Sequence, residues 1–520
     1  MTVRSIRNSY RLATTEPYKR RWTVVALAAL AVLMFAYHLT FLQFDKQTKD
    51  RAANLSLAVN LAFEGRFVPF DQNGPYARRE PAYPFLLAGT VIALDRLGIH
   101  TINRECAGRE NIYKERCIQQ YTWLKPVNLI LLMLTALLSA FTIHIMSGSS
   151  IAAVLGLLAV ANSGYLLRQA DQFMSEVLAA MLLATLAFAS IRVVQSGRLL
   201  GAAFCGNVLG LLMLTKAIFQ YAWFPLLLFL VAVSVFVHRK PVSYVAATAT
   251  VFLCGVLAVT GPWLLRNQFA GIGPKIVDGR SGNVLMIRAN YNDMTDEEYR
   301  IAYLYFNPYF GRKYPEKAGV PKRLYERLDR QNPDGFYQRG KHATPQDPSC
   351  PPIREGQSKN AALVACALER IRGNLWGHLR NVPLMLFRGS FREIGLGQYK
   401  EKLAPTIGDA IGIRLPRIGQ GGNRLSRMIY GLTAVFALFF TALYGLSKFN
   451  WSMVGLTLIA CYAFGMLAGL THFIPRYATP MIPIQITCII VLLAGATSRL
   501  SECARRVLGL LKVPPDNDEV

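Results

Sequence analysis

The chain has 520 residues, of which 52% are hydrophobic and 17% charged, and its mean hydropathy is +0.28. This composition is typical of a protein that crosses a membrane several times, and it excludes an ordinary soluble enzyme. The formal net charge of +26 is explained by basic inside loops and contact with anionic membrane lipids, or by an anionic lipid substrate. Because no recognition motif accompanies the charge, we expect no nucleic-acid partner.

The N-terminal residues 1–22 carry six basic side chains against Glu16 alone, which predicts a cytoplasmic N-terminus. The first apolar run is long enough to cross and lacks a small-residue cleavage site, so it is expected to be an uncleaved anchor. Ten runs in all are predicted to span: residues 23–43, 126–147, 150–167, 175–194, 199–215, 218–237, 243–265, 426–447, 451–470 and 479–497.

A further apolar run, residues 83–98, decides which loops lie outside. If it crossed, the short arginine-bearing loops near 192–198 and 238–240 and the basic tail would all lie outside. We therefore treat it as interfacial or re-entrant, which puts both termini in the cytoplasm and residues 44–125 and 267–425 outside.

The predicted fold is an α-helical polytopic bundle of about ten membrane helices with an outside (periplasmic) soluble segment of mixed structure. Within that segment, residues 358–395 have helical periodicity, Trp376 and many arginines, which predicts a helix returning to the membrane surface. The division by residues is a cytoplasmic N-terminus 1–22, a membrane module 23–265 that includes the outside loop 44–125, the outside segment 266–425, C-terminal membrane helices 426–497 and a cytoplasmic tail 498–520.

The nine cysteines are distributed in a way that agrees with this topology. Cys106 and Cys117 fall in the first outside loop, and Cys350 and Cys366 in the large outside segment. Two disulfides in an oxidising compartment and four free buried thiols are both compatible with these positions. No metal-ligand motif accompanies the cysteines.

Residues 50–84 are the most informative stretch. Asp50 opens a short amphipathic helix that Gly65 can end, and a polar turn follows. Two arginines, a glutamate and the pair Pro81 and Pro84 come next. An acid and a basic pair at the interface suggest chemistry on a phosphate-bearing lipid.

Four motifs of the chain resemble the GT-C class of glycosyltransferases, most closely the group of protein O-mannosyltransferases and lipid A aminoarabinose transferases. They lie in that family's order along the membrane part. The motifs are Asp50 with Asn54-Leu55, Glu64-Gly65 and Arg79-Glu80-Pro81-Ala82-Tyr83-Pro84; Ser175-Glu176; Gly261-Pro262-Trp263-Leu264-Leu265-Arg266-Asn267; and Arg476-Tyr477-Ala478-Thr479-Pro480. The resemblance implies transfer of a sugar from a polyprenyl-phosphate donor to a lipid, glycan or protein acceptor, at the outer face of a bacterial inner membrane.

The resemblance and the residue chemistry together assign roles. A carboxylate can deprotonate the acceptor, and arginines offer forked donors to phosphate oxygens. Asp50 is the expected base, with Asp45 as the alternative acid, and His472 stays outside the set. The full set is Asp50 and Glu176 as catalytic residues; Arg266, Arg476, Arg78 and Arg79 for the donor phosphate; and Glu80, Tyr83, Asp171 and Tyr477 for the acceptor and its orientation.

Each of these residues also has a purely structural explanation. Asp50 can simply mark the solvated end of a span, interfacial arginines commonly extend to headgroups, and Glu176 or Asp171 can cap a helix. The family often has a second acid after the position of Asp50, where this chain has Arg51. We therefore expect no cofactor, with a divalent metal as the option left open. The rival functions are a lipid or polysaccharide transporter and a non-catalytic envelope assembly protein.

Overall fold

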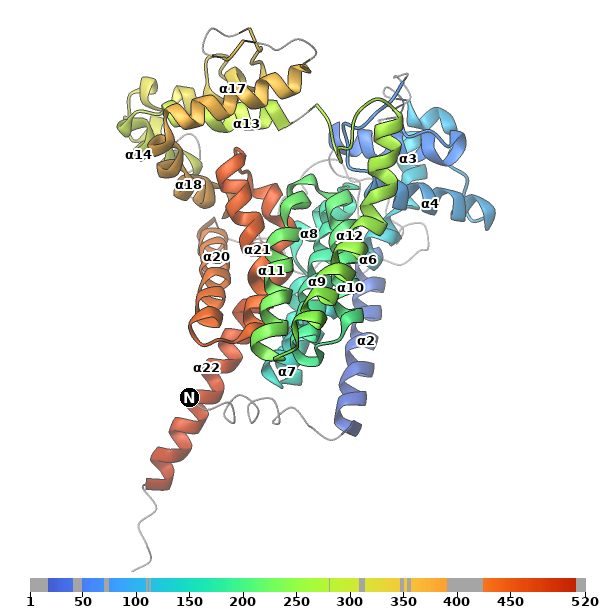
Figure 1. Cartoon of the computed structure of the whole chain (residues 1–520), viewed down its shortest axis with the longest axis vertical. Helices are drawn as coiled ribbons and strands as arrows, with labels where there is room; N and C mark the ends of the chain where they lie inside the picture. Colours follow the sequence, from blue (N-terminus) through green and yellow to red (C-terminus); the bar gives the residue numbers. More distant parts are fainter. Residues whose placement is uncertain are drawn as a thin grey trace, which may run out of the picture.

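The computed structural model describes residues 17–40, 49–69, 74–108, 111, 114–279, 281–307, 314–346, 350–352, 357–390 and 424–510. All regular structure in these residues is helical. Figure 1 shows a bundle of roughly parallel helices with a second group of helices covering one of its ends. The α-helical membrane class expected from composition is therefore confirmed.

Six helices of the described residues are long and apolar enough to cross a membrane, or seven if the bent pair α7 and α8 counts as one span. The bent pair and three shorter apolar helices lie where the sequence predicts the other four spans. Every predicted span therefore contains a helix, but the number of ten spans stays a prediction. The six are α2 (Pro17–Leu39), α6 (Lys125–Ser147), α9 (Glu176–Ser196), α12 (Val242–Phe269), α21 (Trp451–Leu470) and α22 (Ile482–Leu510); the others are α7 (Ser150–Ala161), α8 (Gly164–Asp171), α10 (Leu199–Thr215), α11 (Trp223–Ala232) and α20 (Arg424–Ser447).

Glycines let α10 and α12 pack with their backbones in close contact. A Cβ added to Gly206 would lie 2.2 Å from the carbonyl oxygen of Phe252, and one added to Gly255 would lie 2.6 Å from that of Ala203. Such close approach is how membrane helices gain dispersion energy, because burial from water contributes nothing between lipid-facing helices. The packing fixes the outer end of α10, from which Lys216 emerges.

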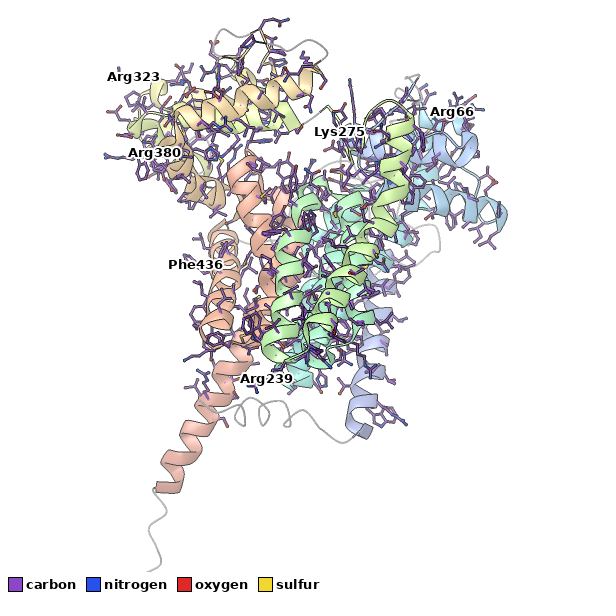
Figure 2. The ribbon with its side chains drawn as sticks, in the orientation of Figure 1. Arg66, Arg239, Lys275, Arg323, Arg380 and Phe436 are labelled. Atoms are coloured by element: carbon purple, nitrogen blue, oxygen red, sulfur yellow. A yellow bond between two sulfur atoms is a disulfide. The ribbon has the colours of Figure 1, made fainter. Side chains whose placement is uncertain are left out.

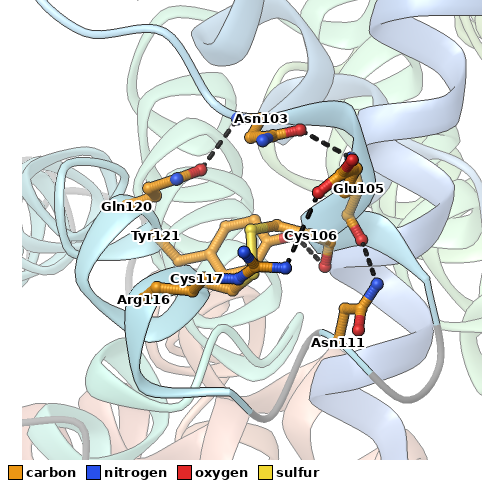
Figure 3. Close-up of a disulfide and its surroundings, with 8 residues drawn as sticks. All are labelled: Asn103, Glu105, Cys106, Asn111, Arg116, Cys117, Gln120 and Tyr121. Atoms are coloured by element: carbon orange, nitrogen blue, oxygen red, sulfur yellow. Dashed lines mark hydrogen bonds and ion pairs between the residues drawn. A yellow bond between two sulfur atoms is a disulfide. The ribbon is translucent and has the colours of Figure 1, made fainter.

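The first outside loop folds against the end of the bundle. It contains α3 (Lys49–Glu64), α4 (Ala82–Arg96) and α5 (Glu115–Thr122). Helix α4 covers most of the apolar run 83–98 and lies crosswise to the spans (Figure 1). Its interfacial placement stays a prediction. The Cys106–Cys117 disulfide closes the loop, and the Tyr121 hydroxyl donates to the Cys106 carbonyl at 2.7 Å (Figure 3).

The large outside segment is a group of short helices. The principal ones are α13 (Ser281–Asn290), α14 (Asp296–Phe306), α16 (Phe336–Lys341), α17 (Lys359–Gly373) and α18 (Leu375–Ser390). The second expected pair, Cys350 and Cys366, forms a disulfide within it. The fully buried Arg288 donates to the Ala468 carbonyl of α21 at 3.0 Å and to the His378 carbonyl at 2.8 Å, which ties the segment to the bundle.

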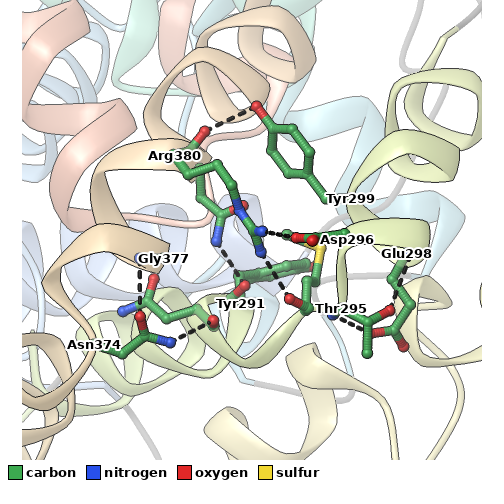
Figure 4. A network of polar contacts seen from close by, with 11 residues as sticks. Tyr291, Thr295, Asp296, Glu298, Tyr299, Asn374, Gly377 and Arg380 are labelled. Atoms are coloured by element: carbon green, nitrogen blue, oxygen red, sulfur yellow. Dashed lines mark hydrogen bonds and ion pairs between the residues drawn. The ribbon is translucent and has the colours of Figure 1, made fainter.

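The predicted surface helix at 358–395 is two helices in its described residues. The break lies at Asn374, whose side chain accepts from the Gly377 N–H at 2.9 Å and donates to the Asn292 carbonyl at 2.9 Å. An Asn at this point caps the second helix, which a periodicity argument does not detect. In the same network, Arg380 pairs with Asp296 and donates to the Met294 carbonyl at 2.7 Å (Figure 4).

Basic side chains occupy both ends of the bundle in Figure 2, with Arg239 at the end opposite Arg66 and Lys275. Between the ends, Phe436 of α20 is 71% exposed. Exposed aromatic side chains at mid-bundle are expected where the helices face lipid.

Candidate functional site

Five charged side chains meet at the end of the bundle that carries α3, and we call them the carboxylate–cation cluster. They are Asp50, Arg79, Glu176, Lys216 and Arg476. They come from α3, the turn before α4, the start of α9, the end of α10 and the 3-10 helix η8 (Pro475–Met481). Four of the five are residues that the sequence motifs single out.

Arg476 is the centre of the cluster. Its Nη2 lies 2.7 Å from Asp50 Oδ2, and its Nε lies 3.4 Å from Glu176 Oε1. Arg79 donates to the other oxygen of Asp50, and Lys216 Nζ lies 3.1 Å from Glu176 Oε1. Three cations thus share two carboxylates, so the cluster carries a net positive charge before Glu80 is counted.

Local structure explains where the two acids stand. Asp50 lies in the first turn of α3 and Glu176 in the first turn of α9, where the helix dipole favours a negative charge. Lys216 has an extended backbone, with φ −147° and ψ 110°, because α10 ends there and the chain turns into η3 (Ala217–Tyr221). Glu80 accepts a hydrogen bond from the Ala217 N–H at 3.2 Å, which joins this turn to the one carrying Arg79.

The environment of Asp50 sets its pKa. Burial raises it, but the guanidinium groups of Arg79 and Arg476 lower it by more, so the pKa of Asp50 lies well below its ordinary value. The carboxylate is therefore ionised at neutral pH and held by two strong donors. A carboxylate held in this way accepts a proton readily only when another anion takes those donors.

Glu176 differs from Asp50 in its contacts. Its side chain is 1% exposed and lies near two cations, yet neither carboxylate oxygen makes an aligned hydrogen bond within the described residues. A buried carboxylate in this state can still accept a hydrogen bond from a bound molecule.

The four residues predicted for the acceptor lie around the cluster in different settings. Glu80 borders it as described, and the Tyr477 ring centre lies 5.8 Å from the Arg476 guanidinium. Tyr83 is buried and donates to Asn128 at 3.0 Å. Asp171 is also buried and pairs with Lys125 at 2.5 Å. Tyr83 and Asp171 therefore belong to the packing beneath the cluster.

Two arginines predicted for the donor phosphate have no contact with the cluster in the described part of the chain. Arg266 lies over the Trp263 ring at 4.9 Å and donates to the Tyr76 carbonyl at 3.1 Å. Arg78 is exposed and lies near Gly279. Asp45, the alternative acid, falls outside the described residues.

Lys216 is the member that sequence reasoning missed. It stands between two predicted spans, residues 199–215 and 218–237, so in the sequence it resembles an ordinary polar residue of a loop between two membrane helices. The available signal was the predicted topology, which puts this short connection on the same side as Asp50, Glu176 and Arg476. An ionisable residue at such a position is a functional candidate.

The donor set does not fit a divalent metal ion as it stands. Among the described residues, no three His, Cys, Asp or Glu side chains gather in a way that could hold one. The two carboxylates of the cluster are instead shared by three cationic side chains, and no step below depends on a metal.

No protein-family model matches this chain, and no curated protein sequence matches it. Several solved structures are similar to it, and three of them are described here. The archaeal oligosaccharyltransferase AglB from Archaeoglobus fulgidus, in complex with an inhibitory peptide and a dolichol-phosphate, is 12% identical, with a TM-score of 0.47, over 96% of this chain. ArnT from Cupriavidus metallidurans is 14% identical in the apo state (TM-score 0.35, 92% of this chain) and 13% identical bound to undecaprenyl phosphate (TM-score 0.37, 95%).

This chain spans about half of AglB, 53% of its length, and 77–81% of ArnT. AglB and ArnT are GT-C glycosyltransferases, the class that the sequence motifs resemble.

Proposed function

We propose that this protein is an integral membrane glycosyltransferase that moves a sugar from a polyprenyl-phosphate donor to an acceptor at the outer face of a bacterial inner membrane. The observation that carries the proposal is the position of Arg476 between the carboxylates of Asp50 and Glu176, with Arg79 and Lys216 beside them. The carrier class is that of the lipids bound in two of the similar structures, dolichol-phosphate and undecaprenyl phosphate.

The cations of the cluster suit the phosphate of the carrier. Arginine offers several donors to phosphate oxygens, and lysine adds a point charge. Arg476 lies in the turn that leads into α22, so a phosphate held there would lie at the membrane surface with its lipid tail beside the helices. Glu176 holds Arg476 and Lys216 in place for this contact.

Asp50 supplies the base in the transfer step. The acceptor oxygen attacks the anomeric carbon, the bond from that carbon to the phosphate oxygen breaks, and polyprenyl phosphate leaves with the electron pair. The acceptor proton passes to Asp50 and then to water. When the donor phosphate engages Arg79 and Arg476, it weakens their hold on Asp50, so burial can raise the pKa of the carboxylate. Donor binding thereby activates the base.

The two disulfides support an extracytoplasmic placement. Cys106–Cys117 and Cys350–Cys366 belong to segments at the same end of the bundle as α3 and α17 (Figure 1). Disulfides form in oxidising compartments such as the periplasm, so the cluster is proposed to face that side.

The transporter alternative expects broken helices in two related halves of the chain. In the described residues one pair of helices, α7 and α8, is bent, by 44°. A non-catalytic assembly protein would need no acid held between two arginines. Neither alternative accounts for the cluster.

The test is transfer by the purified full-length protein with a panel of labelled polyprenyl-phosphate sugars and with lipid, glycan and peptide acceptors. The proposal expects at least one donor to yield labelled product and free polyprenyl phosphate in equal amounts. Transport of an intact lipid-linked sugar across vesicles, with no transfer product from any donor, would contradict it.

A further inference from the structure

A series of rings and guanidinium groups leads from the cluster into the outside segment. Arg476 lies 5.8 Å from the centre of the Tyr477 ring, and the His472 imidazole follows at 5.7 Å. The Tyr337 ring of α16 lies 5.3 Å from His472 and has the Arg330 guanidinium 4.3 Å from its centre. We call Arg330, Tyr337, His472 and Tyr477 the aromatic–arginine series.

Arg330 is the last member of the series, and its guanidinium forms no ion pair within the described residues. It is exposed, and its Nη2 donates to the Tyr337 hydroxyl at 2.7 Å. The neighbouring Asp329 accepts from the Gln331 N–H instead of pairing with it. In the part of the chain that the structure describes, no carboxylate forms an ion pair with Arg330, so most of its five N–H donors remain for another anion.

His472 adds an unused polar atom in the middle of the series. Its side chain is 4% exposed, and its Nδ1 has no hydrogen-bond partner among the described residues. Burial and the nearby Arg388, Arg330 and Arg476 lower the pKa of His472 to about 3. The imidazole is therefore neutral, and a sugar hydroxyl, which both donates and accepts, can satisfy its nitrogen.

Arg388, Arg330 and Arg476 all act on the middle of the series at His472, whereas the carboxylates of Asp50 and Glu176 lie near its Tyr477 end. Arg388, which is mostly buried, donates to the Tyr291 hydroxyl at 3.1 Å and lies 4.2 Å from the Phe306 ring centre, so its charge is also not neutralised by a carboxylate in the described residues. At the Arg330 end, where no carboxylate of the described residues forms an ion pair, the carboxylate of a saccharide would be attracted. The two tyrosine rings can contact the apolar face of a pyranose ring where Arg330, His472 and Arg476 do not cover them.

We propose that the aromatic–arginine series binds the sugar of the donor, and that this sugar carries a carboxylate that pairs with Arg330. The inference rests on the function proposed above, since the carrier phosphate must be held at Arg476 for the sugar to lie along the series. It makes the outside segment part of the substrate site, through Tyr337 and Arg330, and names hexuronic acids as the donor class.

The test compares three probes by equilibrium binding to the purified full-length protein: decaprenyl phosphate, decaprenyl-phosphate hexose and decaprenyl-phosphate hexuronic acid. The hexuronic acid is expected to bind on the order of tenfold more tightly than the hexose, the value of one charged hydrogen bond. Arg330→Gln should abolish this preference and leave the Kd of the other two probes unchanged. Arg323→Gln, which removes an exposed arginine of the same segment, should keep it.

The outcomes separate the two proposals. Equal affinity of the wild-type protein for the two sugar-bearing probes would overturn this inference alone. Weaker binding of all three probes by Arg330→Gln, together with a lower Tm, would assign the series to docking of the outside segment and also overturn it. Failure of decaprenyl phosphate itself to bind would overturn the proposed function and the inference together.

Discussion

The guanidinium group of Arg476 lies 2.7 Å from the carboxylate of Asp50, although the two residues stand near opposite ends of the chain. The contact joins the start of α3 to the turn that leads into α22. Through its Nε the same side chain also approaches Glu176 at 3.4 Å. One arginine therefore fixes the relative positions of both acids, and its removal is the first test of the site.

Arg476→Ala should weaken binding of decaprenyl phosphate by about 1.5–3 kcal/mol, because one charged hydrogen bond to the phosphate is lost. Arg476→Lys should restore part of the loss, since lysine keeps the charge but not the forked geometry. Equilibrium binding to the purified protein measures both variants. Arg266→Ala is the matched control: it also stands at the outer end of a span, but it contacts Trp263 and Tyr76. If Arg266→Ala and Arg476→Ala lose the same affinity for decaprenyl phosphate, both arginines bind the phosphate.

Lys216→Gln should lower the affinity for the donor by about tenfold, because it removes one of the three cations proposed to attract the carrier phosphate. Lys240→Gln serves as the control for loss of charge alone, because Lys240 is exposed and follows Arg239, which Figure 2 shows at the opposite end of the bundle. A Kd for decaprenyl phosphate equal to that of the wild-type protein would show that Lys216 does not bind the phosphate and only pairs with Glu176.

Arg79→Gln should move the acid limb of the pH–rate profile to higher pH. Arg79 stabilises the ionised form of Asp50 and lowers its pKa, so its removal raises the pKa and the base becomes protonated at a higher pH. Transfer rates between pH 4 and 8 measure the shift. Arg66→Gln, which breaks the Arg66–Glu64 pair at 2.8 Å, should leave the limb in place. An unmoved limb in Arg79→Gln would separate Arg79 from the base.

The proposed orientation of the bundle predicts which cysteine reporters an impermeant reagent can reach. In a background without its free cysteines, Lys322→Cys in the outside segment should be labelled in intact cells, and Lys240→Cys only after permeabilisation. Both side chains are exposed, so a difference in labelling reports their side of the membrane. Labelling of Lys240→Cys in intact cells would reverse the predicted parity and make residues 83–98 a true span.

Sequence reasoning located the helices and much of the cluster for physical reasons. Long apolar runs can satisfy their backbone groups in a membrane only as helices. Asp50, Glu176 and Arg476 each follow or precede such a run on the same predicted side, so their meeting could be anticipated. Arg266 carries the same signal, yet it packs on Trp263. The direction in which a helix end presents its side chain depends on neighbours that one sequence does not reveal.

The outside segment was less predictable, because its structure depends on single polar contacts between distant residues. Asn374 divides the predicted surface helix through a bond to Asn292, and Arg288 ties the segment to α21 through the Ala468 carbonyl. Hydrophobic periodicity in the sequence predicts neither contact. The series from Tyr477 to Arg330 was missed for the same reason, since it forms only when α16 lies beside the loop that carries His472.

Asp50→Asn tests whether Asp50 is the base that the proposed transfer needs. The amide keeps the shape of the side chain and removes the proton acceptor, so decaprenyl phosphate should still bind while transfer falls by roughly 10²-fold or more. Arg476 and Arg79 contact Asp50 directly, so the Tm is measured alongside to show that the fold survives. Transfer at the wild-type rate by a folded Asp50→Asn protein would show that Asp50 is not the base.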